Sequence, residues 1–129
     1  MTDAPILSLR GLTKAYAGAA GTTQVLGGID LDVREGEFIA VLGFSGAGKT
    51  TLVSAIAGLI EADSGSIELR GKPIDGPGKD RGLVFQSYSL FPWLSVEANV
   101  ALAVDAVHQD RSPADRAALV RQKVELVGL

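Results

Sequence analysis

A nine-residue stretch, Gly43-Phe44-Ser45-Gly46-Ala47-Gly48-Lys49-Thr50-Thr51, constrains this chain more than any other feature. It has the form G-x-x-x-x-G-K-[ST] of a phosphate-binding loop, the P-loop. Small residues let the backbone wrap tightly, so that successive N–H groups point inward at phosphate oxygens. Lys49 is expected to reach the β- and γ-phosphates, and the Thr50 hydroxyl to ligate Mg²⁺. The predicted phosphate-binding residues are Gly43, Ser45, Gly46, Ala47, Gly48, Lys49, Thr50 and Thr51.

The segments beside the loop fit the strand–loop–helix context that the motif requires. Residues 37–42 form an apolar run before the loop, as expected for a buried parallel strand. Residues 52–57 follow it at helical spacing, and Gly58 can end that helix. Residues 82–85 form another apolar run and predict a further strand, ending at Gln86. This context favours a P-loop over a glycine-rich turn without a ligand.

The bulk composition is that of one ordinary globular domain. The chain has 129 residues, of which 47% are hydrophobic and 21% charged, with a net charge of −3. No basic run exists, so nucleic-acid binding is not expected. There is no cysteine, which excludes disulfides and thiolate metal sites within the chain. The apolar runs are too short for a membrane span, so we expect a cytoplasmic protein whose membrane role comes through a partner.

Alternation and turn residues place the other elements. Alternating segments predict strands at 6–10, 25–33 and 66–70, and Gly- and Pro-rich segments predict loops at 17–23 and 71–79. Ser95 can cap a helix from Val96 to about Val107. The Ser112-Pro113-Ala114-Asp115 stretch has a cap, a proline at the first helical position and a capping-box acid. It predicts a second helix that ends near Val127.

Several stretches, in this order and at these intervals, resemble the ATP-binding subunit of an ABC transporter. They are Lys14–Tyr16, the P-loop, Asp63–Ile67, Val84–Gln86 and Ser89–Val100. The Gln86–Val100 stretch looks most like that of nitrate, sulfonate and taurine importers. The resemblance covers essentially the whole chain.

The resemblance implies an α/β fold. This would be a P-loop NTPase (ABC ATPase) core with an antiparallel β portion and the start of a helical subdomain. Residues 1–129 would be the N-terminal part of an ABC-type ATP-binding domain. Within it, residues 1–94 would form the nucleotide-binding core and β portion, and residues 95–129 the start of the helical subdomain.

The same resemblance implies roles for two further residues. Tyr16 corresponds to the aromatic residue that stacks on adenine, and a ring beside the P-loop can offer its face to a purine. Without the resemblance, the residues alone favour a strand-end tyrosine that only packs. Gln86 corresponds to the glutamine that contacts Mg²⁺ and the attacking water, and its side-chain carbonyl is a suitable hard ligand. ATP and Mg²⁺ are thus the expected cofactors.

An aromatic stretch after Gln86 is interpreted in two ways. Tyr88, Phe91 and Trp93 stand among turn residues, which by itself suits a small cluster buried under a loop. In the family, this region helps to form the groove that receives the transmembrane permease subunit, and an aromatic anchor suits that use. The family also implies a homodimer of the complete subunit, peripheral on the inner face of the cell membrane.

The sequence departs from the family where catalysis is concerned. It lacks the LSGGQ signature, the Walker B strand with its Mg²⁺-binding Asp and catalytic Glu, and the switch histidine. Residues 102–105 (Leu-Ala-Val-Asp) mimic a Walker B strand, but no Glu follows and they lie in a helical pattern. His108 precedes the signature region, so it is not the switch histidine. No catalytic residue is assigned, and the chain looks like the N-terminal half of the subunit.

The function predicted from these observations is ATP binding in the energy-coupling subunit of an importer for nitrate, sulfonate or taurine. Hydrolysis is expected only in the complete dimeric subunit. A non-hydrolysing nucleotide-binding or docking fragment is the alternative. Another P-loop NTPase, such as a GTPase or small-molecule kinase, is a third interpretation, against which Tyr16 and the Gln86–Trp93 stretch argue.

Overall fold

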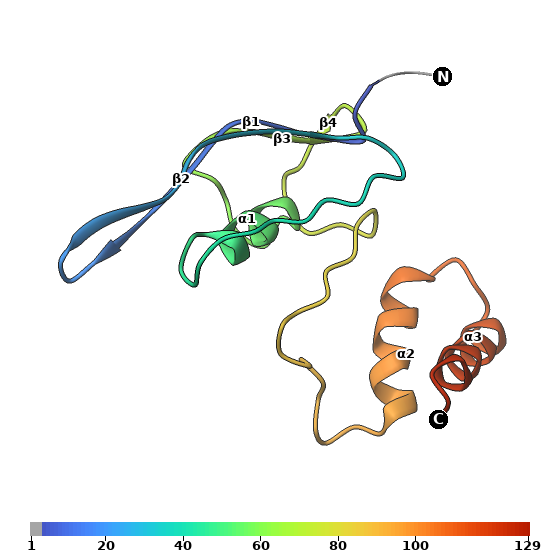
Figure 1. The fold of residues 1–129 in the computed structure, drawn as a ribbon. Coiled ribbons are helices and arrows are strands. Elements are labelled where there is room, and N and C mark those ends of the chain that lie inside the picture. The colour runs from blue at the N-terminus through green and yellow to red at the C-terminus, as the bar shows by residue number, and fades with distance from the viewer. Residues whose placement is uncertain (1–3) are drawn as a thin grey trace. The chain divides into compact units, whose positions relative to one another are not determined.

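The structure, a computed structural model, describes residues 4–129. Contacts divide the chain into two units, one ending at Gly82 and the other spanning Leu83–Leu129. Figure 1 shows the elements, which are β1 (Leu7–Gly18), β2 (Gly21–Val33), α1 (Lys49–Ile56), β3 (Ser64–Leu69), β4 (Lys72–Pro73), α2 (Val96–Val107) and α3 (Pro113–Leu126). The predicted division into residues 1–94 and 95–129 stays a prediction.

The first unit contains one antiparallel sheet, with strand order β2-β1-β3-β4. Its register places Leu9 of β1 opposite Leu31 of β2 and Ile67 of β3. Opposed residues on neighbouring strands share one face of a sheet, so these three side chains form an apolar row across it.

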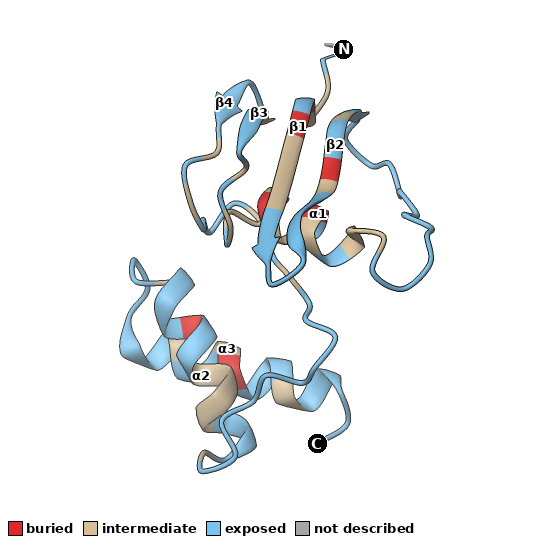
Figure 2. Cartoon of the chain, turned by 90° about the vertical axis from the view of Figure 1, so that its left-hand side faces the viewer, coloured by how far each residue is buried: buried red, intermediate tan, exposed pale blue. Residues whose placement is uncertain are grey.

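Helix α1 covers the apolar face of the sheet (Figures 1 and 2). Leu52 and Ala55 of α1 are buried in one cluster with Leu9, Leu12 and Leu26. Leu9 and Leu12 are completely buried. Burial of a leucine side chain contributes about 1.5–3 kcal/mol, so this contact holds α1, and with it the P-loop, against β1 and β2.

The hairpin between β1 and β2 is longer than predicted. The loop predicted at 17–23 is wrong, since β1 continues to Gly18 and β2 begins at Gly21. Only Ala19 and Ala20 form the turn. Gly21, with φ of 115°, supplies a conformation that other residues avoid. The loop predicted at 71–79 likewise contains the short edge strand β4, where Pro73 is tolerated because an edge has an unpaired side.

The strands predicted at 37–42 and 82–85 are absent from the described structure. Phe38 and Val84 are 93% and 96% exposed. An apolar run shows that a segment suits a buried strand, but a parallel strand also needs neighbours to pair with. No strand among residues 4–129 pairs with either segment.

The second unit contains a pair of helices whose predicted starts are correct. Ser95 accepts a hydrogen bond from the N–H of Ala98 at 3.1 Å, and Ser112 accepts one from Asp115 at 3.1 Å. Both are N-caps that satisfy otherwise unpaired helix donors. The longest helix, α3, has 14 residues, and no helix among the described residues could cross a membrane.

The stretch at 102–105 lies within α2, as predicted. The Asp105 carboxylate forms an ion pair with Arg116 of α3 at 3.0 Å. Val104 and Val120 are the buried residues of the two helices. Residues 102–105 therefore have a structural role in the contact between α2 and α3.

Candidate functional site

The P-loop leads from an extended segment directly into α1. The N–H of Ala47 donates to the carbonyl of Phe44 at 3.1 Å and closes a turn. Gly46 and Gly48 have φ of 84° and 93°, the left-handed conformation that glycine adopts without strain. Gly48 is the N-cap of α1, and its carbonyl accepts the N–H of Leu52 at 2.9 Å. The sequence therefore folds here into a tight loop that ends at a helix N-terminus.

Gly48 also lies against strand β2. A Cβ atom at this position would be 2.8 Å from the carbonyl oxygen of Val25 and 2.9 Å from its side chain. Val25 is the extra residue of a β-bulge, since Lys14 opposes Leu26 while Ala15 opposes Gln24. The β-bulge at Val25 is therefore in contact with the end of the P-loop.

Lys49 folds back over its own loop. Its Nζ donates to the carbonyl oxygens of Gly43 at 2.6 Å and Phe44 at 2.7 Å. These bonds use two of the three donors of the ammonium group. The ammonium group is therefore held beside its own loop. Its third donor has no bonded partner among the described residues, so it is available for a phosphate oxygen.

The first turn of α1 favours an anion and a metal-bound phosphate. It contains no acidic residue that would neutralise the positive end of the helix dipole. Thr50 is exposed in this turn, whereas Thr51 is half-buried. Mg²⁺ commonly takes only one or two protein oxygens and completes its shell with phosphates and waters, so the Thr50 hydroxyl fits such an ion. Of the other predicted loop residues, Gly43, Ser45 and Gly46 are exposed, and Ala47, Gly48 and Lys49 are half-buried.

Tyr16 lies on the same hairpin that supports the P-loop. It opposes Thr23 of β2, two residues from the Val25 that contacts Gly48, or about 7 Å along the strand. Its side chain is 44% exposed. The first unit therefore brings Tyr16 and the P-loop to one part of β2, and leaves the ring accessible to a ligand.

Gln86, the second predicted Mg²⁺ ligand, belongs to the other unit. Its side chain is exposed. Its assignment to the metal site stays a prediction. Among residues 4–129 no group of three His, Cys, Asp or Glu side chains could hold a metal ion on its own.

The aromatic stretch of the second unit is exposed. Tyr88, Phe91 and Trp93 all have accessible rings, with Trp93 at 75%. The rings of Phe91 and Trp93 lie 5.2 Å apart and tilted by 46°. This arrangement differs from the buried cluster that the residues alone allow.

Asn99 holds the turn that carries Trp93. Its Oδ1 accepts the N–H of Phe91 at 2.9 Å. Its Nδ2 donates to the carbonyls of Phe91, Leu94 and Ser95 at 3.1, 3.3 and 3.0 Å. The sequence interpretation did not single out Asn99; the only local signal is its place in the first turn of a helix capped by Ser95.

A carboxylate to which the sequence interpretation gave no role of its own contacts the strand of Tyr16. Asp63 accepts hydrogen bonds from Lys14 Nζ at 2.8 Å and from the N–H of Ala15 at 2.7 Å. Both bonds favour the ionised form and lower the pKa of Asp63, and the same contact raises the pKa of Lys14. Asp63 and Ala15 are 48 positions apart, so no local pattern could have predicted the contact.

Comparison with known proteins gives concordant results. The family model described as "ABC transporter" matches residues 26–129. Over 125 residues the chain is 43% identical to the bicarbonate transport ATP-binding protein CmpD of Synechococcus elongatus, covering 97% of this chain and 45% of that protein. Over 101 residues it is 48% identical to the nitrate import ATP-binding protein NrtC of the same organism, covering 78% of this chain and 15% of that protein.

A solved structure has the same fold. The ATP-binding cassette MJ0796, solved as a dimer in a post-hydrolysis state with ADP and phosphate, matches with a TM-score of 0.83 at 26% identity. The match covers 95% of this chain and 57% of that one, so the chain spans about half or less of the proteins that it resembles. Because the family model covers most of the sequence and the fold is that of an ATP-binding cassette, this protein belongs to the ABC transporter family.

Proposed function

We propose that this chain binds Mg·ATP as part of the ATP-binding subunit of an importer for a small oxyanion. The observation that carries the proposal is the P-loop itself. Its end is fitted against Val25 at Gly48, and its Lys49 ammonium is held by the carbonyls of Gly43 and Phe44. This arrangement places a fixed cation and a helix N-terminus at one point, as binding of a polyphosphate requires.

The phosphates and the metal ion would be bound by different groups. The N–H groups of residues 43–51 surround the phosphates, and Lys49 neutralises charge on the β- and γ-phosphates. Thr50 contributes a hydroxyl ligand to Mg²⁺, and Gln86 a side-chain carbonyl. Magnesium, when bound, neutralises phosphate charge. We expect Thr50→Ala to weaken the binding of Mg·ATP more than it weakens the binding of metal-free ATP, so that binding depends less on Mg²⁺.

Tyr16 would provide the platform for the base. Its exposed ring and its place near the P-loop along β2 suit a stacking partner for adenine. Competition between ATP and GTP for the same site tests this assignment against a GTPase or a small-molecule kinase. Displacement of labelled ATP by GTP at concentrations far below that of ATP would favour a GTPase and contradict it.

The proposed substrate class follows from relatives whose names specify nitrate or bicarbonate import. Both are small, planar oxyanions. The sulfonate and taurine classes rest only on the resemblance of the Gln86–Val100 stretch. Selectivity among these ions would be a property of other subunits, so transport by the assembled importer is the measurement that decides it.

The proposed partners are a transmembrane permease subunit and a second copy of the complete subunit. Exposed aromatic side chains at Tyr88, Phe91 and Trp93 would contact the permease, which would hold the protein at the inner face of the membrane. In a full-length subunit, Trp93→Ala should reduce co-purification with the permease. Normal assembly and normal transport would return this stretch to a structural role.

A second candidate function is nucleotide-dependent docking without hydrolysis. One observation favours it: Asp105, which ends the stretch most like a Walker B strand, lies in α2 and is paired with Arg116. Release of phosphate from ATP by the complete dimeric subunit distinguishes the two candidates, because the chain alone is expected to release none in either case.

A further inference from the structure

Asp63 occupies the point where the pairing of β1 with β3 stops. The last opposed pair is Thr13 with Ser64, and the hydroxyls of these residues are 2.6 Å apart. Asp63 precedes this pair, and its own N–H donates to the carbonyl of Thr13 at 2.9 Å. Beyond Thr13, no described strand pairs with this edge of β1.

The carboxylate of Asp63 extends the sheet contact further along β1. Its Oδ2 accepts the N–H of Ala15 at 2.7 Å, a donor that would otherwise face the open edge. A hydrogen bond to a charged acceptor is stronger than one between neutral groups. Asp63 thus fixes the backbone immediately before Tyr16, at the bulge where β1 and β2 change register.

The same carboxylate also fixes the group beneath the Tyr16 ring. Its Oδ1 accepts from Lys14 Nζ at 2.8 Å, and that ammonium lies 5.6 Å from the ring centroid. A cation at this distance is attracted to the face of an aromatic ring. Lys14 therefore occupies one face of Tyr16, and the opposite face is the one that a base can use.

We infer that Asp63 is the positioning residue of the base platform. Through Ala15 it sets the backbone of Tyr16, and through Lys14 it sets the orientation of the ring. The inference rests on the proposed role of Tyr16 in stacking on adenine. Its consequence is specific: Asp63 contributes to recognition of the base and not to recognition of the phosphates.

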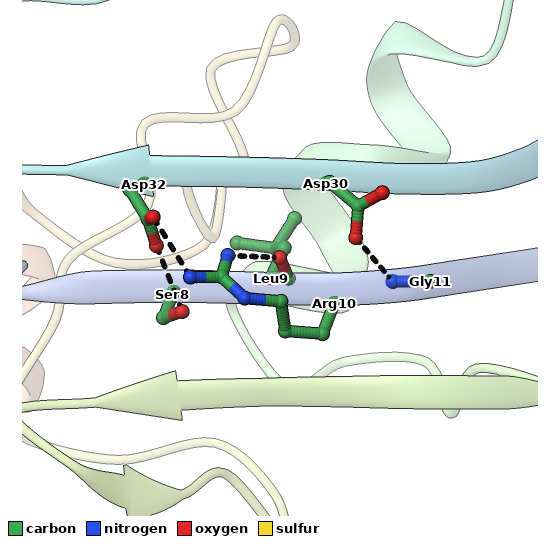
Figure 3. A network of polar contacts seen from close by, with 6 residues as sticks. All are labelled: Ser8, Leu9, Arg10, Gly11, Asp30 and Asp32. Atoms are coloured by element: carbon green, nitrogen blue, oxygen red, sulfur yellow. Dashed lines mark hydrogen bonds and ion pairs between the residues drawn. The ribbon is translucent and has the colours of Figure 1, made fainter.

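The chain offers a matched control, a second carboxylate that accepts a hydrogen bond from a backbone amide of β1. Asp30 of β2 accepts the N–H of Gly11 at 2.8 Å, so it is a second carboxylate bonded to a β1 amide (Figure 3). Gly11 is distant from Tyr16 along β1, and Asp30 contacts neither Lys14 nor Ala15 among the described bonds. Loss of Asp30 should therefore perturb the strand without disturbing the platform.

The test compares the affinities of the full chain for Mg·ATP and for inorganic tripolyphosphate, which lacks a base. We expect Asp63→Ala to weaken ATP binding about fivefold or more, within the range of a lost base stack, with tripolyphosphate affinity unchanged. Asp63→Asn, which can still accept from Ala15 but cannot pair with the ammonium, should fall between wild type and Asp63→Ala. Asp30→Ala should leave the ratio of the two affinities unchanged.

A second measurement does not depend on affinity. In wild type, the amide proton of Ala15 should show a chemical shift that titrates with Asp63, and this titration should be absent in Asp63→Asn. An Ala15 shift that is independent of pH would overturn the inference.

Failure of the inference can be told from failure of the proposed function. If Tyr16→Ala weakens ATP binding but Asp63→Ala does not, the inference alone is wrong. If Asp63→Ala lowers the affinities for Mg·ATP and for tripolyphosphate equally, the role of Asp63 is structural. If Tyr16→Ala leaves ATP affinity unchanged, the proposed role of Tyr16 fails, and the inference fails with it.

Discussion

The carbonyl oxygen of Val25 lies against Gly48, only 2.8 Å from the position that a Cβ atom on this glycine would take. The contact joins the bulged hairpin to the end of the P-loop, two segments that are far apart in the sequence. Two separate reasons therefore favour glycine at position 48. Its φ of 93° disfavours other residues, and its neighbour leaves no space for one.

We predict that Gly48→Ala destabilises the protein and weakens ATP binding at least about tenfold, which corresponds to about 1.4 kcal/mol. Gly36→Ala is the control, because Gly36 has a similar φ of 82° but no atom within 4 Å of a Cβ. Gly36→Ala should cost only the left-handed strain of about 1–2 kcal/mol in the free energy of unfolding. Chemical denaturation and ATP titration measure the two effects. Equal losses for both variants would show that the contact with Val25 is unimportant.

The parts of the fold that depend on local chemistry could be predicted from the sequence. The caps at Ser95 and Ser112 predicted the starts of α2 and α3. The P-loop motif predicted a helix after the loop, although α1 begins at Lys49, three residues before the predicted segment at 52–57. The strands predicted at 37–42 and 82–85 are wrong, because a strand depends on pairing partners that an apolar run does not specify.

The candidate site shows the same division. The P-loop residues follow from a motif, whereas the contacts of Val25 with Gly48 and of Asp63 with Ala15 join segments more than twenty positions apart. Such contacts depend on strand register and on a bulge, neither of which has a clear signature in this sequence.

The only tryptophan of the chain reports on the aromatic turn of the second unit. Asn99→Ala removes four hydrogen bonds from residues 91–95, so we expect Trp93 fluorescence to show lower anisotropy and easier quenching by acrylamide. Asn99→Asp should be intermediate, because a carboxylate can accept from Phe91 but cannot donate to the carbonyls. Unchanged Trp93 fluorescence in Asn99→Ala would contradict a clamping role.

The stability of the first unit should depend on pH through Asp63 and Lys14. The pKa of Asp63 is lowered from 3.8 in the folded state, chiefly by its bond with Lys14. Its stabilising effect is therefore present above the unfolded pKa and is lost as the pH falls through the lower, folded value.

The pKa of Lys14 is raised from 10.5, chiefly by the same bond, with the carboxylate of Glu61 as a further charge nearby. Its contribution is present below the unfolded pKa and is lost as the pH rises through the raised value. Denaturation of wild type and Asp63→Asn across this range is the measurement. The difference between their unfolding free energies should shrink at both extremes; a difference that is constant with pH would contradict the ion pair.

We predict that this chain alone does not turn over ATP at a useful rate. Transfer of a phosphoryl group to water needs a positioned acceptor for the proton, and loss of a general base commonly costs about 10²–10⁴ in rate. Asp105, the best sequence candidate for a metal-binding carboxylate, is paired with Arg116. Phosphate release near the median enzyme rate of about 10 s⁻¹, lost in Lys49→Ala, would show that a catalytic carboxylate has been missed.

The central claim is that the P-loop binds the phosphates of ATP through Lys49. Calorimetric titration of the 129-residue chain with Mg·ATP tests it most directly, with Lys49→Ala as the variant and Lys72→Ala, an exposed lysine on β4, as the control. The account predicts saturable binding by wild type and Lys72→Ala, and affinity at least about tenfold lower in Lys49→Ala. Equal affinities of wild type and Lys49→Ala, or no binding by wild type, would contradict it.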